Sequence, residues 1–306
     1  MELNALQDDF EVAKESSSLA ARLALVVFCL AAGFAYRLIV GLLPANVIQM
    51  GVLLVLSLFF LGITVLARKK QRLIKYWEIP FAFFVFTIAG IAGDQAGFIQ
   101  QTFVRTVLHE IPSVQNPLGS TVIGMVLAQL ASTASLIIPI LLLTTVSGHD
   151  LKSIFIAKPR NWWTLVVGLI GFLVYYRFTA SGHAQRFFPN NGVTPSQFLA
   201  LTPALIVLVL CNGLREELWF RGLFLNKYGK FLSPLSSNIL SAIIFTSFHV
   251  QVQYTPALLP FLAIALVLGL FFGFLMQKSG SVLASVIFHA GSDIPIFLVY
   301  LSYALG

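Results

Sequence analysis

Residues 208–229 read LVLCNGLREELWFRGLFLNKYG, an apolar run that contains the adjacent glutamates Glu216 and Glu217 and the arginines Arg215 and Arg221. A helix needs roughly 20 apolar residues to cross the hydrocarbon layer of a membrane. Ionisable side chains are costly at that depth and are found there mainly for functional reasons. This stretch therefore predicts a membrane helix that carries a polar site.

The whole chain is nearly as apolar as this stretch. Of its 306 residues, 58% are hydrophobic and 10% are charged, and the mean hydropathy is +0.89. A soluble globular domain has roughly 25% charged residues. We therefore expect an all-α, polytopic transmembrane bundle of eight or nine helices. The candidate spans are residues 22–43, 47–67, 80–98, 118–146, 162–180, 198–224, 235–253, 258–277 and 282–303.

Basic residues between these spans predict the orientation of the chain, because short loops rich in Lys and Arg stay in the cytoplasm. Counting from the cluster between the second and third spans gives an odd number of spans and a cytoplasmic N-terminus. The loops, with their attraction to anionic lipid, account for the net charge of +7, so no nucleic-acid partner is expected. The basic residues placed inside are Arg68, Lys69, Lys70, Arg72, Lys75, Lys152, Lys158, Arg160, Lys227, Lys230 and Lys278.

The chain divides into three parts. Residues 1–20, MELNALQDDFEVAKESSSLA, are expected to form a short cytoplasmic tail, since they lack the pattern of a signal peptide. Residues 21–150 are expected to form N-terminal membrane helices and contain no motif with recognisable chemistry. Three motifs that do suggest chemistry lie in residues 151–306.

Glu216, Glu217 and Arg221 form the first motif. Residues four apart lie on one face of a helix, whereas neighbours are turned by about 100°. Glu217 and Arg221 can therefore pair, while Glu216 points elsewhere and is free to react. The alternative is an interfacial helix that ends in a salt bridge and has no chemical role.

Two further motifs place histidines at the same spacing. Phe245-x-x-x-His249 lies near the end of an apolar segment, where a lone histidine is often a hydrogen-bonded structural residue. His289-x-x-x-Asp293 lets a carboxylate orient an imidazole, or lets both side chains face one cavity. The alternative for this pair is a polar contact that bridges two helices.

The expected position of His249 across the membrane differs from those of Glu216 and His289. On a straight-helix count, Glu216 and His289 fall in the cytoplasmic half of the membrane, whereas His249 lies nearer the far side. A tilted helix, a late helix start after Pro234, or a broken helix would bring the three side chains together.

In their order and spacing, the three motifs resemble those of the CPBP family of intramembrane proteases. This family is also called the CAAX protease and bacteriocin-processing, or Abi, group, and it includes the type II CAAX prenyl endopeptidases. The resemblance covers roughly residues 160–303. It implies that residues 151–306 form a CPBP-like catalytic membrane region.

The resemblance also implies a role for each motif residue. Glu216 and His249 would activate a water molecule for attack on a peptide carbonyl. His289 and Asp293 would stabilise the oxyanion or complete the polar pocket. These four residues are the expected catalytic set.

The resemblance extends to positions 217 and 221, and the chain departs from the family pattern at position 293. Glu217 and Arg221 would form a structural pair that positions Glu216. At position 293 the family often has asparagine, whereas this chain has Asp293. An ionised aspartate would repel a developing oxyanion, so we expect Asp293 to be protonated, to orient His289 or to take part in metal binding.

A zinc ion is the alternative to a cofactor-free site. Glu216, His249 and His289 would leave an open fourth position, as in catalytic zinc sites. The sequence lacks His-Glu-x-x-His, however, so we expect no cofactor to be required.

The sequence therefore indicates an intramembrane endopeptidase that acts on a membrane-associated protein or peptide, in a bacterial-type plasma membrane. Its partners would be this substrate and membrane lipid, and the sequence carries no signal for an oligomeric state. A proton- or ion-coupled carrier is the first alternative, but a carrier would usually distribute its ionisable residues along a path. A catalytically silent membrane scaffold is the second, although every expected catalytic position is filled apart from the variation at Asp293.

Overall fold

The computed structural model describes residues 19–44, 47–106 and 121–305. The first 18 residues of the expected cytoplasmic tail lie outside the described residues. Within the described ranges the chain is helical and contains no β-strand. The all-α fold class expected from the sequence is confirmed.

Within the part of the chain that the structure describes, eight helices are long and apolar enough to cross a membrane. This confirms the expected bundle of eight or nine helices and makes the chain an integral membrane protein. The long helices are α2 (Leu19–Leu42), α3 (Val47–Lys69), α4 (Glu78–Thr106), α5 (Val122–Val146), α6 (Trp163–Ala180), α7 (Pro195–Glu216), α10 (Leu258–Ser279) and α11 (Leu283–Ser302).

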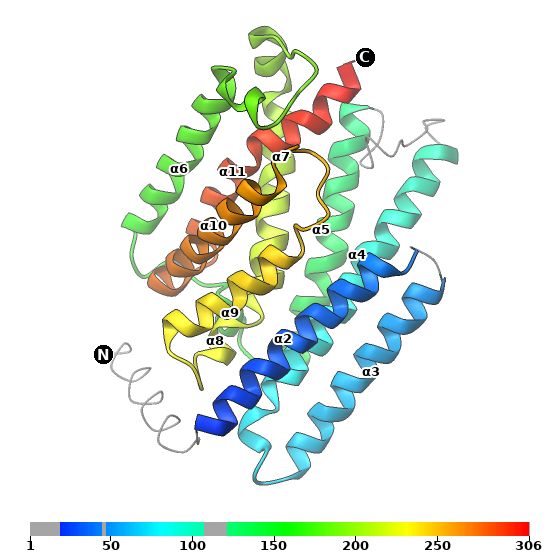
Figure 1. Ribbon diagram of the computed structural model, residues 1–306, viewed down its shortest axis with the longest axis vertical. Coiled ribbons are helices and arrows are strands. Elements are labelled where there is room, and N and C mark those ends of the chain that lie inside the picture. The colour runs from blue at the N-terminus through cyan, green and yellow to red at the C-terminus, as the bar shows by residue number, and fades with distance from the viewer. Residues whose placement is uncertain (1–18, 45–46, 107–120, 306) are drawn as a thin grey trace.

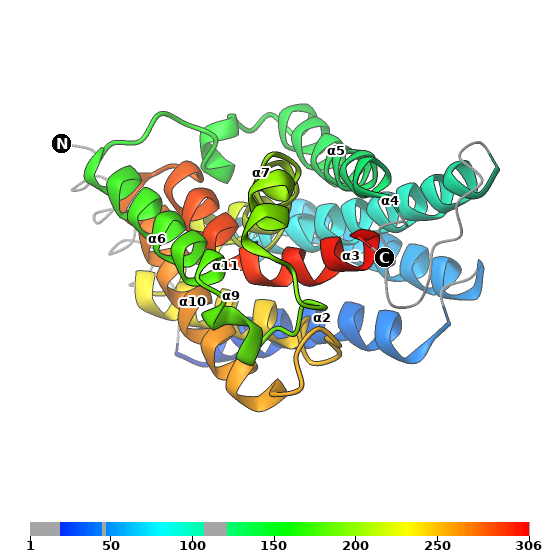
Figure 2. The ribbon, with the colours of Figure 1, turned by 90° about the horizontal axis from the view of Figure 1, so that it is seen from above.

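The helices run side by side, with α2, α3 and α4 on one side of the bundle and α6 and α10 on the other (Figure 1). Seen from above, α7 and α11 lie between the two groups (Figure 2). Of the 18-residue apolar window in α11, 72% is buried, against 28% in α2, α3 and α5. Helix α11 is therefore the central helix, which explains how it can hold polar side chains away from lipid.

Close contact between α6 and α11 fixes this central helix. A Cβ atom at Gly291 would meet backbone atoms of Phe172 in α6. Small residues let membrane helices approach closely, and van der Waals packing then drives their association. Because Gly291 lies between His289 and Asp293, this contact holds the part of α11 that carries the third motif.

Helix α7 begins with a capping box and ends in a change of helix type. Thr194 is the N-cap, and its side chain and that of Gln197 satisfy each other's backbone amides. After Glu216 the chain forms a π-helix over Glu217–Gly222. Single π-helical turns are frequent at functional sites, because they displace side chains from the regular face of a helix.

Helix α9 (Pro234–Ser247) is shorter than the seventh candidate span, residues 235–253. Ser233 caps it and Pro234 occupies its first turn, and its 14 residues extend about 21 Å at 1.5 Å per residue. That length is less than the roughly 30 Å hydrocarbon thickness. The sequence overestimated this element because apolar residues continue beyond the point where the helix ends.

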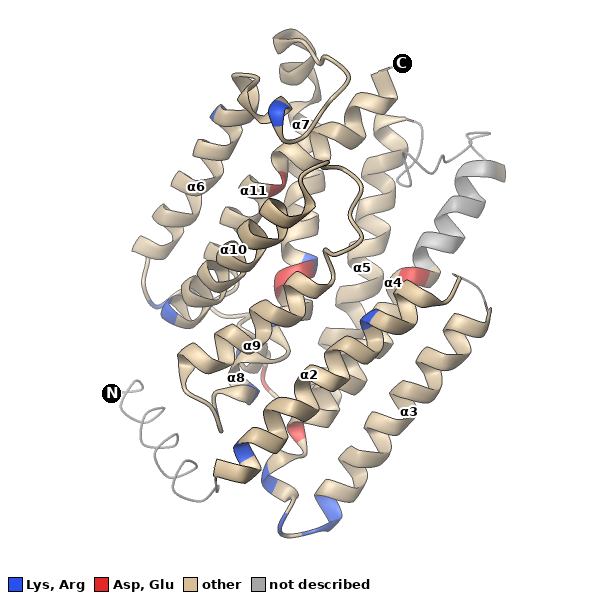
Figure 3. Cartoon of the chain, viewed as in Figure 1, with Lys and Arg blue, Asp and Glu red and all other residues tan. Residues whose placement is uncertain are grey.

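The ends of the bundle differ in charge. The beginning of α2 and the end of α11 lie at opposite ends of the bundle (Figure 1). Lys and Arg gather at the end where α3 and α10 finish, with Arg68, Lys69 and Lys278 in their last turns (Figure 3). This distribution fits a cytoplasmic side at that end, and the orientation in the membrane stays a prediction.

Candidate active site

Glu217, at the start of the π-helix, connects two of the three motifs. Its Oε1 accepts a hydrogen bond from Arg221 Nη1 at 2.6 Å, and both side chains are fully buried. The same oxygen lies 2.8 Å from Nδ1 of His289 in α11. A carboxylate only accepts hydrogen bonds, so Nδ1 of His289 donates and carries a proton. The Glu217–Arg221 pair thus also orients the histidine of the third motif.

Aromatic rings enclose His289 and Arg221. The His289 ring stacks on Phe272 of α10 with 4.7 Å between centroids, and Phe245 of α9 meets it edge-on at 5.8 Å. The Arg221 guanidinium lies 4.2 Å from the Phe245 ring centroid. Two of its nitrogens, Nε and Nη2, are buried without a hydrogen-bond partner among the described residues. The phenylalanine of the second motif therefore stabilises a buried cation through its ring face.

Glu216 has one occupied and one free carboxylate oxygen. Its Oε1 accepts a hydrogen bond from Asn212 Nδ2 at 3.1 Å and lies 3.7 Å from Arg215 Nη2. Its Oε2 is buried, has no hydrogen-bond partner among the described residues, and lies 3.6 Å from Nε2 of His289. Buried polar atoms without a partner are rare in folded proteins and often mark a catalytic role or an ordered water molecule.

Asp293 lies on the same face of α11 as His289. Its Oδ2 accepts a hydrogen bond from Asn212 Nδ2 at 2.8 Å and lies 3.6 Å from Nε2 of His289. Nε2 of His289 is thus equally far from one oxygen of Glu216 and one of Asp293. The structure brings the first and third motifs together around this one nitrogen.

His249 lies in the turn that follows α9. Its Nδ1 donates a hydrogen bond to the carbonyl of Phe245 at 3.0 Å, which leaves Nε2 as the nitrogen that can accept. The Phe245 ring is 4.6 Å from the His249 ring and 5.8 Å from the His289 ring, so both imidazoles contact the same side chain. His249 also interacts electrostatically with Glu216. Helix α9 begins at Pro234 and ends at Ser247, so His249 lies beyond the end of this helix and not within it.

Helix α2 holds the segment that carries His249. Arg37 Nε donates to the carbonyl of Ser247 at 3.1 Å, and the Tyr36 ring stacks on Phe248 with 5.8 Å between centroids. The two residues that precede His249 thus contact α2, which lies outside the three motifs. Nothing in the sequence indicated this contact, because Arg37 lies in an apolar span without a motif.

Asn212 belongs to none of the three sequence motifs. This side chain is 7% exposed and contacts both Glu216 and Asp293 through its amide nitrogen. One signal could have found it: Asn212 is a polar residue in an apolar run, four residues before Glu216 and therefore on the same helix face.

The arrangement does not fit a preformed metal site. Across the described parts of the chain, no three His, Cys, Asp or Glu side chains are placed so that they could hold a metal ion. In the set expected for zinc, Nδ1 of His289 donates to Glu217 and Nδ1 of His249 donates to a backbone carbonyl, so only the Nε2 atoms of the two rings could bind a metal ion. Among the described side chains, these atoms and the Glu216 carboxylate do not converge on one such position.

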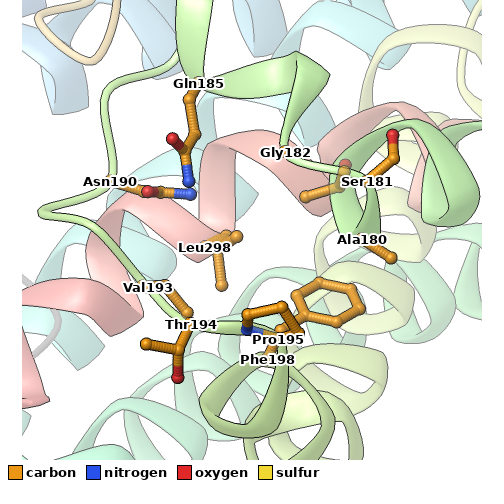
Figure 4. Close-up of a pocket in the computed structure, with 11 residues that line it drawn as sticks. Ala180, Ser181, Gly182, Gln185, Asn190, Val193, Thr194, Pro195, Phe198 and Leu298 are labelled. Atoms are coloured by element: carbon orange, nitrogen blue, oxygen red, sulfur yellow. The ribbon is translucent and has the colours of Figure 1, made fainter.

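A cavity of about 130 Å³ lies at the other end of α7, away from these motifs (Figure 4). Its lining includes Ser181, Gln185, Asn190 and Phe198, and no ionisable side chain. Phe198 precedes Glu216 by a helix length of about 27 Å. The cavity is therefore separate from the catalytic candidates.

Comparison with known proteins supports the resemblance seen in the motifs. Residues 198–294 match the family model described as type II CAAX prenyl endopeptidase Rce1-like. No curated protein and no solved structure matches the chain. The matched range contains all three motifs in order, so over these residues the chain is similar to the CAAX protease, or CPBP, family.

Proposed function

We propose that this protein is an intramembrane endopeptidase in which Glu216 and His249 activate a water molecule to hydrolyse a peptide bond of a membrane-associated protein or peptide. The match of residues 198–294 to a protease family model supports peptidase activity in general. The observation that carries the finer assignment is the buried, unpartnered Oε2 of Glu216, which faces the imidazole of His289.

Glu216 and His249 each present one atom that can take a proton from water. Oε1 of Glu216 is held by Asn212, and Nδ1 of His249 is held by the Phe245 carbonyl. Oε2 and Nε2 are therefore the accepting atoms. A general base must lie within hydrogen-bond reach of the proton it removes, directly or through one water molecule. A shared water molecule between these two atoms would meet this condition.

His289 is suited to stabilise the oxygen of the tetrahedral intermediate. Its Nδ1 is fixed by Glu217, and the stack on Phe272 fixes the plane of its ring. In its imidazolium form, Nε2 can donate a hydrogen bond into the space beside Glu216. Donors that are oriented before the reaction stabilise developing charge without reorganisation at the moment of reaction.

Asp293 acts on His289 rather than on the substrate oxygen in this scheme. Its Oδ2 lies 3.6 Å from Nε2 of His289 and is hydrogen-bonded to Asn212. A carboxylate near Nε2 stabilises the imidazolium through its charge, whereas Glu217, at Nδ1, takes the position that the buried aspartate has in serine proteases. Of the three roles considered for Asp293, this one agrees best with its contacts.

The proposed reaction does not require a metal ion. Glu216, His249 and His289 are not placed so that they could hold a metal ion together. The buried Glu216 carboxylate can itself take the proton from the attacking water, a step that a metal ion would otherwise assist. The proposed orientation places the N-terminus in the cytoplasm, supported by the basic residues at one end of the bundle (Figure 3).

The test is cleavage of a membrane-anchored peptide library by the purified protein in lipid nanodiscs. Glu216→Gln and His249→Ala should each lower kcat by about 10²–10⁴-fold, the usual contribution of general acid–base catalysis. Glu78→Gln is the matched control, because Glu78 pairs with Lys230 and lies outside the three motifs. All three variants should insert and unfold thermally as the wild type does.

Two outcomes would reject parts of the proposal. Full cleavage by either the Glu216 or the His249 variant would remove that residue from the mechanism. Cleavage by the wild type should also survive a chelator, and loss of activity that zinc restores would show that a metal ion is needed. Absence of cleavage in the wild type across the library would favour the carrier or the silent scaffold.

A further inference from the structure

We propose that Asn212 is the positioning residue of the catalytic base, and that it works as a matched pair with Asp293. The inference rests on the proposed function, because it assigns the group that holds Glu216 for proton abstraction. Asn212 Nδ2 donates to Glu216 Oε1 at 3.1 Å and to Asp293 Oδ2 at 2.8 Å. One amide group thus joins the base in α7 to the carboxylate in α11.

The orientation of the Asn212 amide follows from its other neighbours. Its Oδ1 lies 2.6 Å from Arg215 Nη2 and 3.4 Å from Gln129 Nε2. A guanidinium group has donors and no acceptor, so the oxygen of the amide must face Arg215. The amide NH₂ must then face the two carboxylates, and each of its two hydrogens can serve one of them.

This orientation determines which oxygen of Glu216 can react. A free glutamate has two equivalent carboxylate oxygens and several side-chain rotamers. Asn212 lies one turn before Glu216 and binds Oε1, so Oε2 is the oxygen that points to His289. A base displaced by about 1 Å can cost 10²-fold in rate, because the reacting atoms must be aligned.

Two side chains of helix α5 support Asn212 and its neighbour Arg215. Gln129 donates to Asn212 Oδ1, and Arg215 Nη1 donates to Ser132 Oγ at 3.0 Å, so both supports come from α5. Asn212 is therefore fixed by three helices, α5, α7 and α11. A side chain so constrained can position the groups that it contacts.

The same contacts explain why an aspartate is tolerated at position 293. Glu216 and Asp293 are neighbours, and two carboxylates at close range repel unless a donor lies between them. The Asn212 amide is that donor. The pair needs one amide and one carboxylate, so exchanging the two residues should preserve the interaction better than changing position 212 alone.

The experiment is a double-mutant cycle with Asn212→Asp, Asp293→Asn and both changes together, measured as kcat and KM for the peptide that the wild type cleaves. Asn212→Asp places three carboxylates together and should lower kcat about 10²-fold, with KM changed less than threefold. Asp293→Asn should have the smaller effect, since its amide oxygen can still accept from Asn212. The double variant should recover at least tenfold in kcat over Asn212→Asp.

A second variant at position 212 tests the inference even if Asn212→Asp fails to fold. If Asn212→Asp does not fold, Asn212→Ala removes the donor without adding charge, and it should still lower kcat at least tenfold. Wild-type kcat in Asn212→Ala, or a double variant no faster than Asn212→Asp, would overturn the inference. Full activity of Glu216→Gln would instead reject the proposed function, so the two failures can be told apart.

Discussion

Helix α11 and helices α2, α3 and α5 differ in how much of their surface the rest of the protein covers. Of the apolar window in α11, 72% is buried, against 28% in the other three. Helix α11 carries His289 and Asp293, whereas the first half of the chain contains none of the three motifs. The chemistry is concentrated where neighbouring helices, and not lipid, surround the polar side chains.

The first half nevertheless contacts the site at three points. Arg37 in α2 binds the carbonyl of Ser247, and α4 accepts a hydrogen bond from Trp219 Nε1 at the carbonyl of Phe86, 2.9 Å away. Helix α5 supports Asn212 and Arg215. None of these contacts involves a proposed reacting atom. In the proposed mechanism, the second half of the chain supplies the reacting groups and the first half holds them in place.

The largest expected effect comes from the buried ion pair of the second half. Glu217→Gln removes the charge that faces both Arg221 and His289. Removing one partner of a buried pair leaves an uncompensated charge and typically destabilises a protein by about 3–5 kcal/mol. Denaturant unfolding in detergent micelles should show this loss, together with loss of cleavage. A change below about 1 kcal/mol would mean that Arg221 is stabilised by the Phe245 and Phe272 rings alone.

An intermediate effect is expected from the contact that α2 makes with the turn carrying His249. Arg37→Met keeps a long apolar side chain but removes the donor to the Ser247 carbonyl. We expect kcat to fall about tenfold and the free energy of unfolding to fall by about 1.5–3 kcal/mol, as for hydrogen bonds to charged groups. The matched control is Lys69→Met, at the exposed end of α3. Unchanged kcat in Arg37→Met would show that α2 does not position His249.

The sequence predicted the helices and the local pairs well, for a physical reason. Apolar runs identify membrane helices because the hydrocarbon layer sets their length. Spacing of four residues places Glu217 beside Arg221, since both lie on one helix face. These features depend on residues near each other along the chain, and the composition of one segment is enough to find them.

The contacts between segments could not be predicted in the same way. The hydrogen bond between His289 and Glu217 joins residues 72 positions apart. The position of His249 depends on where α9 ends, and apolar residues after Ser247 hid that point. Asn212 could have been noticed as a polar residue on the face of Glu216, but its bond to Asp293 depends on how α7 packs against α11. Helix packing decides such contacts, and one sequence does not reveal it.

The smallest effect is expected for an ion pair between the two halves near one end of the bundle. Glu78, at the start of α4, accepts a hydrogen bond from Lys230 at 2.7 Å, and the Lys230 side chain is 52% exposed. Water screens such a pair, so Glu78→Gln should change the free energy of unfolding by less than about 1 kcal/mol, and added salt should reduce the difference. The assay is the denaturant unfolding used for Glu217→Gln. A loss as large as that of the buried pair would mean that the halves are joined chiefly through this contact. The aromatic and hydrogen-bond contacts of α2, α4 and α5 would then contribute less to stability than this ion pair. In that case the first half of the chain would not support the site in the way described above.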